Sequence, residues 1–178
     1  MMDVKRKTTE TYNKIASVYS NTRVAHFWID EFDFFKSVID GERVIDMGCG
    51  EGRDAIIFTQ NGFDYTGIDI SEGMLKIAKK RVVGGVFQQA DFSETDFPSS
   101  TFDGFWAAAS FIHIPKNDIK SVLQETKRIT KNGGVGFISR QFPESNATDT
   151  ISVCKNHISA SLRLSAKKSA SGGNRENP

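Results

Sequence analysis

The stretch that decides the fold reads Val44-Ile45-Asp46-Met47-Gly48-Cys49-Gly50-Glu51-Gly52-Arg53-Asp54. Its first four residues form an apolar run that is typical of a short strand buried on both faces. Three glycines then alternate through a turn, and a helix is predicted over residues 53–60. Glycine lets the backbone come close to a ligand, and a helix N-terminus offers free N–H groups and partial positive charge. The stretch therefore predicts a cradle for a small molecule.

Strands and helices alternate along the rest of the chain. Further strands are predicted over residues 64–70, 86–89, 102–107 and 135–139. Helices are predicted from Ser71 to about Arg81 and from Asn117 or Asp118 to residue 129, where a turn over residues 131–134 ends the helix. This alternation predicts an α/β fold with an open, doubly wound parallel sheet. In such sheets the ligand lies beyond the C-terminal ends of the strands, so the loops after the first four strands should meet at one crevice.

Two helices are predicted before this core. Thr8 and Thr9 can cap the first, whose apolar stripe recurs at helical spacing as Tyr12, Ile15, Ala16 and Tyr19. The second is predicted over residues 25–39, with Gly41 at its end. Its aromatic residues share one face, and we expect them to pack in the core.

Composition narrows the class of protein. The 178 residues predict one domain over residues 1–166, with N-terminal helices in 1–40, a core in 42–140 and a disordered tail over 167–178. A net charge of +1 gives no reason to expect a nucleic-acid or membrane partner. No apolar run approaches the roughly 20 residues that span a bilayer, and no secretory signal is recognisable. Cys49 and Cys154 fit no metal or disulfide framework, so we expect a cytoplasmic protein without a metal site.

The glycine spacing argues against two common nucleotide sites. A dinucleotide site has the pattern G-x-G-x-x-G, but Arg53 stands at the position of its third glycine. A phosphate loop of the G-x-x-x-x-G-K-[ST] type is also missing from the sequence. The loop carries the carboxyl groups of Asp46 and Glu51, which repel a pyrophosphate and suit a ligand that bears an ammonium group.

The pattern Asp46-x-Gly48-x-Gly50-x-Gly52 resembles motif I of the class I S-adenosylmethionine-dependent methyltransferases. Later segments resemble the same family in order and spacing: Asp69 at a strand end, Ala90-Asp91-Phe92, Phe102-Asp103-Gly104-Phe105, residues 110–115, and Lys131-Asn132-Gly133-Gly134. The resemblance covers about residues 10–140 and is closest to the small-molecule methyltransferases. It implies a three-layer, Rossmann-like fold, S-adenosylmethionine as cofactor and a small-molecule methyl acceptor.

The resemblance also implies roles for individual residues. Asp69 would bind the ribose hydroxyls, and Asp91 and Phe92 would bracket the adenine. Tyr19 or Arg23, from the family's N-terminal lid, would meet the methionine carboxylate. The other implied cofactor positions are Asp46, Gly48, Cys49, Gly50, Gly52, Ile70, Ala107 and Ala108.

Simpler interpretations exist for several of these residues. Asp69 could cap the helix after Ser71, Asp91 could be a surface acid, and Phe92 could belong to the core. Cys49 is expected in the loop only because it is small.

Methyl transfer from a sulfonium needs mainly an aligned acceptor and exclusion of water. A general base is needed only where the acceptor must lose a tightly held proton. His113 is the candidate, since histidine titrates near neutrality; a structural role is its alternative. The acceptor would dock between the N-terminal helices and the loop after the fourth strand. A catalytically impaired cofactor-binding module is the alternative function, and an NAD-dependent oxidoreductase is less favoured.

The resemblance stops near Arg140, where the family continues with a helix and an antiparallel hairpin. A reduced or atypical hairpin is predicted, because Ile151 and Val153 alternate with polar residues, as do apolar residues over 158–166. A terminal helix over about 151–164 is the alternative. Without cover, the edge of the fifth strand would be exposed, and a homodimer could form through it.

Overall fold

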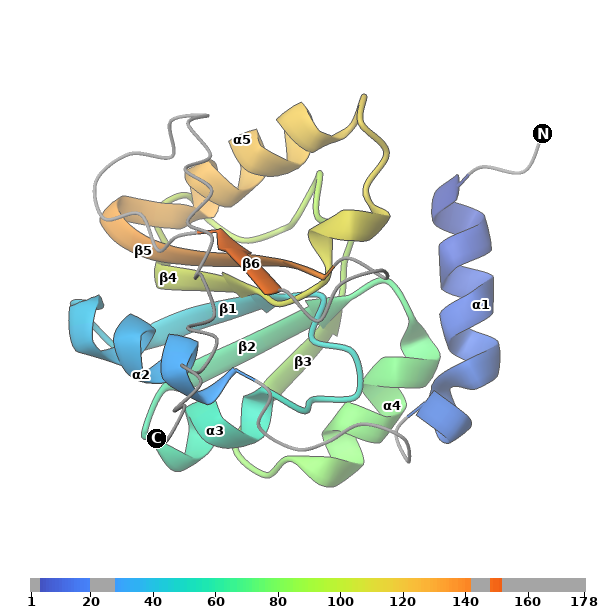
Figure 1. Ribbon diagram of the computed structural model, residues 1–178, viewed down its shortest axis with the longest axis horizontal. Helices are drawn as coiled ribbons and strands as arrows, with labels where there is room; N and C mark the ends of the chain where they lie inside the picture. Colours follow the sequence, from blue (N-terminus) through green and yellow to red (C-terminus); the bar gives the residue numbers. More distant parts are fainter. Residues whose placement is uncertain (1–3, 20–27, 142–147, 152–178) are drawn as a thin grey trace, which may run out of the picture.

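In the part of the chain that the structure describes, six strands form one sheet in the order β3-β2-β1-β4-β5-β6 (Figure 1). The computed structural model describes residues 4–19, 28–141 and 148–151. Strands β1 to β5 pair in parallel, and β6 runs antiparallel to β5. The predicted α/β fold with a mostly parallel sheet is confirmed. The strands are β1 (Arg43–Met47), β2 (Asp64–Asp69), β3 (Val86–Gln89), β4 (Phe102–Ala107), β5 (Thr130–Gln141) and β6 (Thr148–Ile151).

Helices cover both faces of the sheet and so make three layers. Figure 1 shows α5 on one side of the sheet, with α3 and α4 on the other and α1 beside α4. No described helix has the length and apolarity needed to cross a bilayer. The helices are α1 (Val4–Tyr19), α2 (Ile29–Val38), α3 (Ala55–Gln60), α4 (Glu72–Arg81), the 3-10 helix η1 (Phe111–His113) and α5 (Ile119–Ile129).

Two apolar cores lie on either side of the sheet, and β1 contributes to both. Val44 belongs to the core under α2, α3 and α4, whereas Ile45 belongs to the core under α5. Both side chains are fully buried because successive strand residues point to opposite faces. The first core is aromatic: Trp106 stacks on Phe137 with ring centroids 3.8 Å apart, and Phe35 packs edge-on against Trp106. The predicted core role of the aromatic face of α2 is thereby confirmed.

Three helix boundaries differ from the sequence prediction. Helix α1 begins at Val4 rather than at a threonine cap, because the Thr9 hydroxyl donates to the Lys5 carbonyl inside the helix, at 2.9 Å. Helix α3 begins at Ala55, and residues 51–54 form a turn before it. Helix α2 begins at Ile29 within the described residues, whereas residues 25–27 of the predicted helix lie outside them.

Strand β5 is longer than predicted. Thr130, directly after α5, already pairs with Phe102, and regular pairing resumes at Val135 opposite Gly104. The residues between them form an irregularity in which Gly133 has a positive φ of 82°. The predicted turn over residues 131–134 therefore lies within the strand, as an irregularity in its pairing with β4.

The far edge of β5 is partly covered. Residues 138–141 pair with β6, with Ile138 opposite Ile151 and Gln141 opposite Thr148. The antiparallel partner β6 includes Ile151 of the predicted hairpin, of which residues 152–166 lie outside the described part. Ile151 is in a strand, and residues 152–164 of the alternative terminal helix lie outside the described part of the chain.

Candidate functional site

A cleft of about 220 Å³ lies where the loops after β1, β2, β3 and β4 meet α1. Its position beyond the C-terminal ends of the parallel strands is the one that the strand order predicts. Its lining residues are Thr8, Tyr12, Asp46, Gly48, Cys49, Gly50, Glu51, Arg53, Asp54, Asp69, Ile70, Met74, Phe92, Ala108, Ala109, Ser110, Ile112 and His113.

Two glycines give the loop after β1 its path. Gly48 has a φ of +93°, and a β-carbon there would overlap the side chain of Ser110 from the loop after β4. Gly52 has a φ of +77°, and its β-carbon would stand 3.1 Å from Cβ of Ala78 on α4. Gly48 therefore lets two cleft loops meet, whereas Gly52 seats the loop on α4 and does not line the cleft.

Asp69, at the end of β2, connects the two loops that follow β1 and β2. Its Oδ2 accepts from the Gly50 amide at 3.0 Å, and its Oδ1 accepts from the Ser71 amide at 2.8 Å. Burial raises the pKa of this carboxyl, while the two amide hydrogen bonds act in the opposite direction. Each carboxylate oxygen can accept more than one hydrogen bond, so Asp69 can hold the loop and still face a ligand.

Asp46 lies deeper, at the floor of the cleft. Its Oδ2 accepts from the Tyr65 hydroxyl at 2.7 Å, and the residue is only 2% exposed. Burial, with the charge of Asp54 as the next cause, raises the pKa of Asp46 well above its ordinary value. Burial likewise raises the pKa of the neighbouring Cys49 thiol, which leaves Cys49 a poor nucleophile.

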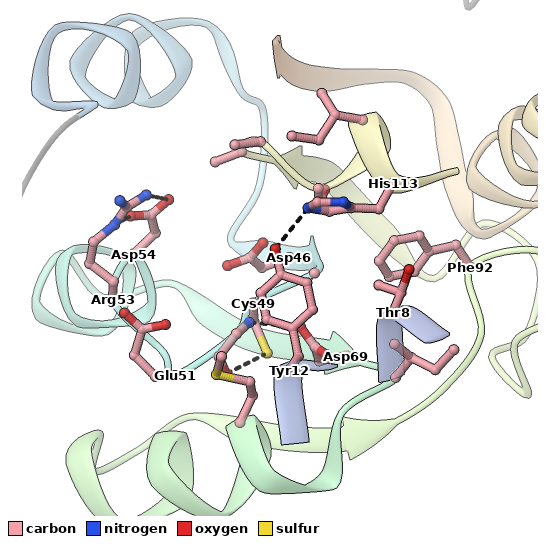
Figure 2. Close-up of a pocket in the computed structure, with 18 residues that line it drawn as sticks. Thr8, Tyr12, Asp46, Cys49, Glu51, Arg53, Asp54, Asp69, Phe92 and His113 are labelled. Carbon is pink, nitrogen blue, oxygen red and sulfur yellow. Dashed lines mark hydrogen bonds and ion pairs between the residues drawn. The ribbon is translucent and has the colours of Figure 1, made fainter. Parts of the chain in front are cut away.

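Arg53 and Asp54 form a two-pronged ion pair at one end of the cleft (Figure 2). Arg53 Nε donates to Asp54 Oδ1 at 2.7 Å, and its Nη2 donates to Oδ2 at 3.2 Å. The indole of Trp106, on β4, also donates to Asp54 Oδ2 at 3.0 Å. The sequence assigned both residues to a helix start, and only their place in the glycine stretch could have marked them as cleft residues.

Two buried polar atoms of the cleft wall have no hydrogen-bond partner among the described residues. They are Glu51 Oε1 and Ser110 Oγ. Glu51 Oε1 lies 3.7 Å from Arg81 Nη1, which is an ionic contact only. An unpaired buried oxygen costs about 1–3 kcal/mol, so a polar ligand that pairs with these atoms would gain binding energy. The cleft thus fits a ligand that carries several hydrogen-bond donors.

Helix α1 closes one side of the cleft and contacts the loops that follow three strands. The Tyr12 hydroxyl lies 2.8 Å from His113 Nε2 in η1. Asn13 Oδ1 accepts from the Ser71 hydroxyl at 2.7 Å and from the Gly73 amide at 2.9 Å. Lys5 Nζ donates to Asp91 Oδ2, in the loop after β3, at 3.0 Å. These contacts place Tyr12 opposite His113 across the mouth of the cleft (Figure 2).

The structure places most, but not all, of the predicted site residues at the cleft. Asp46, Gly48, Cys49, Gly50, Asp69, Ile70, Phe92, Ala108 and His113 line it.

Three predicted residues do not line this cleft. Gly52 packs on α4, and Ala107 is fully buried in the core under α5, where strand alternation directs its side chain. Asp91 lines an adjoining hollow of about 60 Å³, together with Phe92 and His113. The Tyr19 side chain and Arg23 lie outside the described part of the chain.

The list of predicted cofactor and catalytic residues did not include several residues that the fold brings to the cleft. Thr8 and Tyr12 come from α1, and Ser110 and Ile112 come from the segment before and within η1. Tyr12 and His113 are 101 positions apart. No spacing rule relates residues at that separation.

Comparison with known proteins gives a consistent result. Residues 44–134 match a protein family described as "Methyltransferase domain". The 27-O-demethylrifamycin SV methyltransferase of Amycolatopsis mediterranei is 37% identical over 101 residues, which are 53% of this chain and 36% of that protein. A demethylmenaquinone methyltransferase of Symbiobacterium thermophilum is 30% identical over 141 residues, which are 72% of this chain and 53% of that protein.

A solved structure from Thermotoga maritima shares the fold. It is described as an S-adenosylmethionine-dependent methyltransferase, possible histamine N-methyltransferase, and superposes with a TM-score of 0.60 at 22% identity. The match covers 76% of this chain and 62% of that chain. The chain thus spans between about a third and just under two thirds of the lengths of the relatives compared.

Proposed function

This chain belongs to the methyltransferase domain family, whose pattern covers just over half of it, and we propose that it is an S-adenosylmethionine-dependent methyltransferase with a small-molecule acceptor. The observation that carries this proposal is the charge of the cleft. Asp46, Glu51, Asp54 and Asp69 line it together with Arg53 as the one arginine or lysine among the described lining residues. Such a cleft favours a cationic ligand over a pyrophosphate.

The residues of the cleft fit the cofactor. The backbone of Gly48 and Gly50 would approach its amino-acid part, and Asp69 would bind the ribose. Ile70 and Phe92 would hold the adenine, with Asp91 in the adjoining hollow. When bound, the cofactor supplies an activated methyl group. Glu51 Oε1 and Ser110 Oγ, which accept no hydrogen bond from the described residues, offer two further acceptor positions for hydrogen-bond donors on a ligand.

The protein's own contribution is to align an acceptor and keep water out. The acceptor would enter between α1 and the loop after β4, beside Tyr12 and His113. His113 would take a proton where the acceptor has to lose one. The rifamycin name of one relative supports a small-molecule acceptor for this chain as well.

Transfer of a labelled methyl group tests the proposal. The purified chain is incubated with methyl-labelled S-adenosylmethionine and a panel of small phenols, amines and carboxylic acids. We expect label in at least one acceptor. Tight cofactor binding without transfer to any compound would instead favour a cofactor-binding module. Binding of NAD without S-adenosylhomocysteine would favour an oxidoreductase.

A further inference from the structure

Tyr12 and His113 meet at the mouth of the cleft. The Tyr12 hydroxyl lies 2.8 Å from His113 Nε2, and the two rings pack edge to face with centroids 5.4 Å apart. Both residues line the cleft, and Figure 2 shows the hydroxyl directed at the imidazole. Two groups that can exchange a proton are therefore joined by one hydrogen bond inside the candidate site.

The other titratable side chains of the cleft are engaged elsewhere. Asp46 accepts from Tyr65, Asp54 is paired with Arg53 and Trp106, and Asp69 accepts two backbone amides. The fourth carboxylate, Glu51, is nearly buried and lies in ionic contact with Arg81. Carboxylates are also weak bases toward a hydroxyl group, because proton transfer is most efficient when the two partners have similar pKa values. The imidazole of His113 instead lies at the mouth of the cleft, where a hydrogen bond joins it to Tyr12.

The Tyr12–His113 hydrogen bond is not required to satisfy a buried group. His113 is exposed, and Tyr12 is half-buried. Two other contacts already hold helix α1 in place. Asn13 Oδ1 accepts from the Ser71 hydroxyl at 2.7 Å, and Lys5 Nζ donates to Asp91 Oδ2 at 3.0 Å. The exposed ring of His113 can also return a proton to water. Exposure thus suits a proton acceptor that must be reset after each turnover.

We propose that Tyr12 relays the proton of a phenolic acceptor to His113. The inference rests on the proposed methyltransferase function and names its acceptor class. The acceptor O–H bond breaks and its proton passes to Tyr12 Oη, while the proton of Tyr12 passes to His113 Nε2. The acceptor oxygen gains the methyl group, and the electron pair of the broken carbon–sulfur bond stays with sulfur. The acceptor leaves as a methyl ether, and the imidazolium later releases its proton to water.

The acceptor class follows from the strength of the base. An imidazole can take the proton of an acidic hydroxyl such as a phenol, whereas an aliphatic alcohol holds its proton too tightly. An amine attacks through its own lone pair and needs no base before the methyl group arrives. The relay therefore favours phenols over alcohols and over amines.

A comparison of two phenols as methyl acceptors distinguishes the proton relay from a structural role of Tyr12 and His113. At pH 8, 4-nitrophenol is largely ionised and 4-methylphenol is not. We expect Tyr12→Phe and His113→Gln to lower kcat for 4-methylphenol by about 100-fold, and kcat for 4-nitrophenol by no more than a few-fold. Tyr12→Phe keeps the ring that packs on His113. Thr11→Ala, on α1 but away from the cleft, serves as the control and should leave both rates unchanged.

A second readout does not depend on turnover. Calorimetry measures binding of 4-methylphenol to the protein saturated with S-adenosylhomocysteine. Tyr12→Phe should raise the Kd by about 2- to 10-fold, the equivalent of one neutral hydrogen bond. Thr11→Ala should not change it.

Three outcomes would overturn the relay. They are an equal loss of rate for both phenols, an unchanged rate for 4-methylphenol in Tyr12→Phe, and transfer to amines with none to any phenol. The last result leaves the methyltransferase function standing. If no compound accepts the methyl group, both the relay and the proposed activity are contradicted. If S-adenosylhomocysteine does not bind either, the cofactor assignment is the part that is wrong.

Discussion

Asp69 combines a structural contact with a proposed ligand contact. Its two oxygens accept from the amides of Gly50 and Ser71, which belong to the loops after β1 and β2. The same carboxylate lines the cleft. The cap of the following helix is Ser71, whose hydroxyl accepts from the Met74 amide at 3.2 Å, so the alternative role of Asp69 as that cap is wrong.

Removing this carboxylate should weaken cofactor binding. Asp69→Ala is expected to cost about 1.5–3 kcal/mol of S-adenosylhomocysteine binding, through a lost charge-assisted hydrogen bond and a loosened loop. Calorimetry measures the change. Asp64→Ala, at the other end of β2 in an exposed pair with Arg43, is the matched control and should bind as the unchanged protein does. An unaltered Kd for Asp69→Ala would remove Asp69 from the site.

At the scale of single elements, close contacts between loops and helices position the cleft. The loop after β1 sits on α4 through Gly52, and the loop after β3 is held to α5 through Glu125. Asp103 lies at the opposite end of the sheet. Its Oδ2 accepts hydrogen bonds from the backbone amides of Glu42 and Arg43, and its Oδ1 accepts from Lys131 Nζ at 2.6 Å. The contacts of Gly52 and Glu125 fix loops at the end of the sheet that carries the site, whereas those of Asp103 hold the opposite end.

Gly52 should tolerate no side chain. Gly52→Ala is expected to lower the free energy of unfolding by about 2–4 kcal/mol, from a strained positive φ and from contact with Ala78 and Val82. Gly62→Ala is the matched control, because Gly62 has a similar φ of +82° with open space around it. We expect about 1 kcal/mol there. Equal losses in denaturant unfolding would contradict the packing role of Gly52.

The carboxylate of Glu125 should make the free energy of unfolding depend on pH in the acidic range. Its carboxylate accepts from Arg128, at 2.7 Å, and from the amide and hydroxyl of Thr95, at 2.8 and 2.6 Å. The hydrogen bond from Arg128 is the main cause that lowers the pKa of Glu125 from 4.5 to about 2. A carboxyl whose pKa falls on folding stabilises the protein above its unfolded pKa, and this contribution is lost as the pH falls through the folded value.

Glu125→Gln tests that contribution. At neutral pH the variant should be less stable by about 0.5–1 kcal/mol, the range for a partly exposed ion pair. The difference from the unchanged protein should shrink as the pH falls from 4.5 to about 2. Unfolding in denaturant at a series of pH values measures it. A difference that stays constant with pH would contradict the ion-pair account.

At the scale of the whole molecule, local sequence patterns predicted the sheet. They could not predict which helix lies across the cleft. Strands β3 and β4 have the predicted bounds, because short apolar or aromatic runs end at glycine or polar turns. The start of α1 was wrong because Thr9 bonds inside the helix instead of capping it. The sequence left open what would cover the edge of β5, and β6 pairs with part of it.

The candidate site could also be predicted only in part from the sequence. Glycines and acids at strand ends could be placed from sequence, because parallel strands bring their C-terminal ends to one edge. The Tyr12–His113 and Lys5–Asp91 contacts depend on how α1 lies across that edge, and no local pattern encodes the docking of a helix so distant in sequence.

The central claim is that the acidic, glycine-rich cleft binds a sulfonium nucleoside and not a dinucleotide. Calorimetry of the full chain with S-adenosylhomocysteine and, separately, with NAD tests it most directly. We predict saturable binding of S-adenosylhomocysteine at one site per chain and no measurable heat of binding with NAD. Binding of NAD in the absence of any S-adenosylhomocysteine binding would contradict the account.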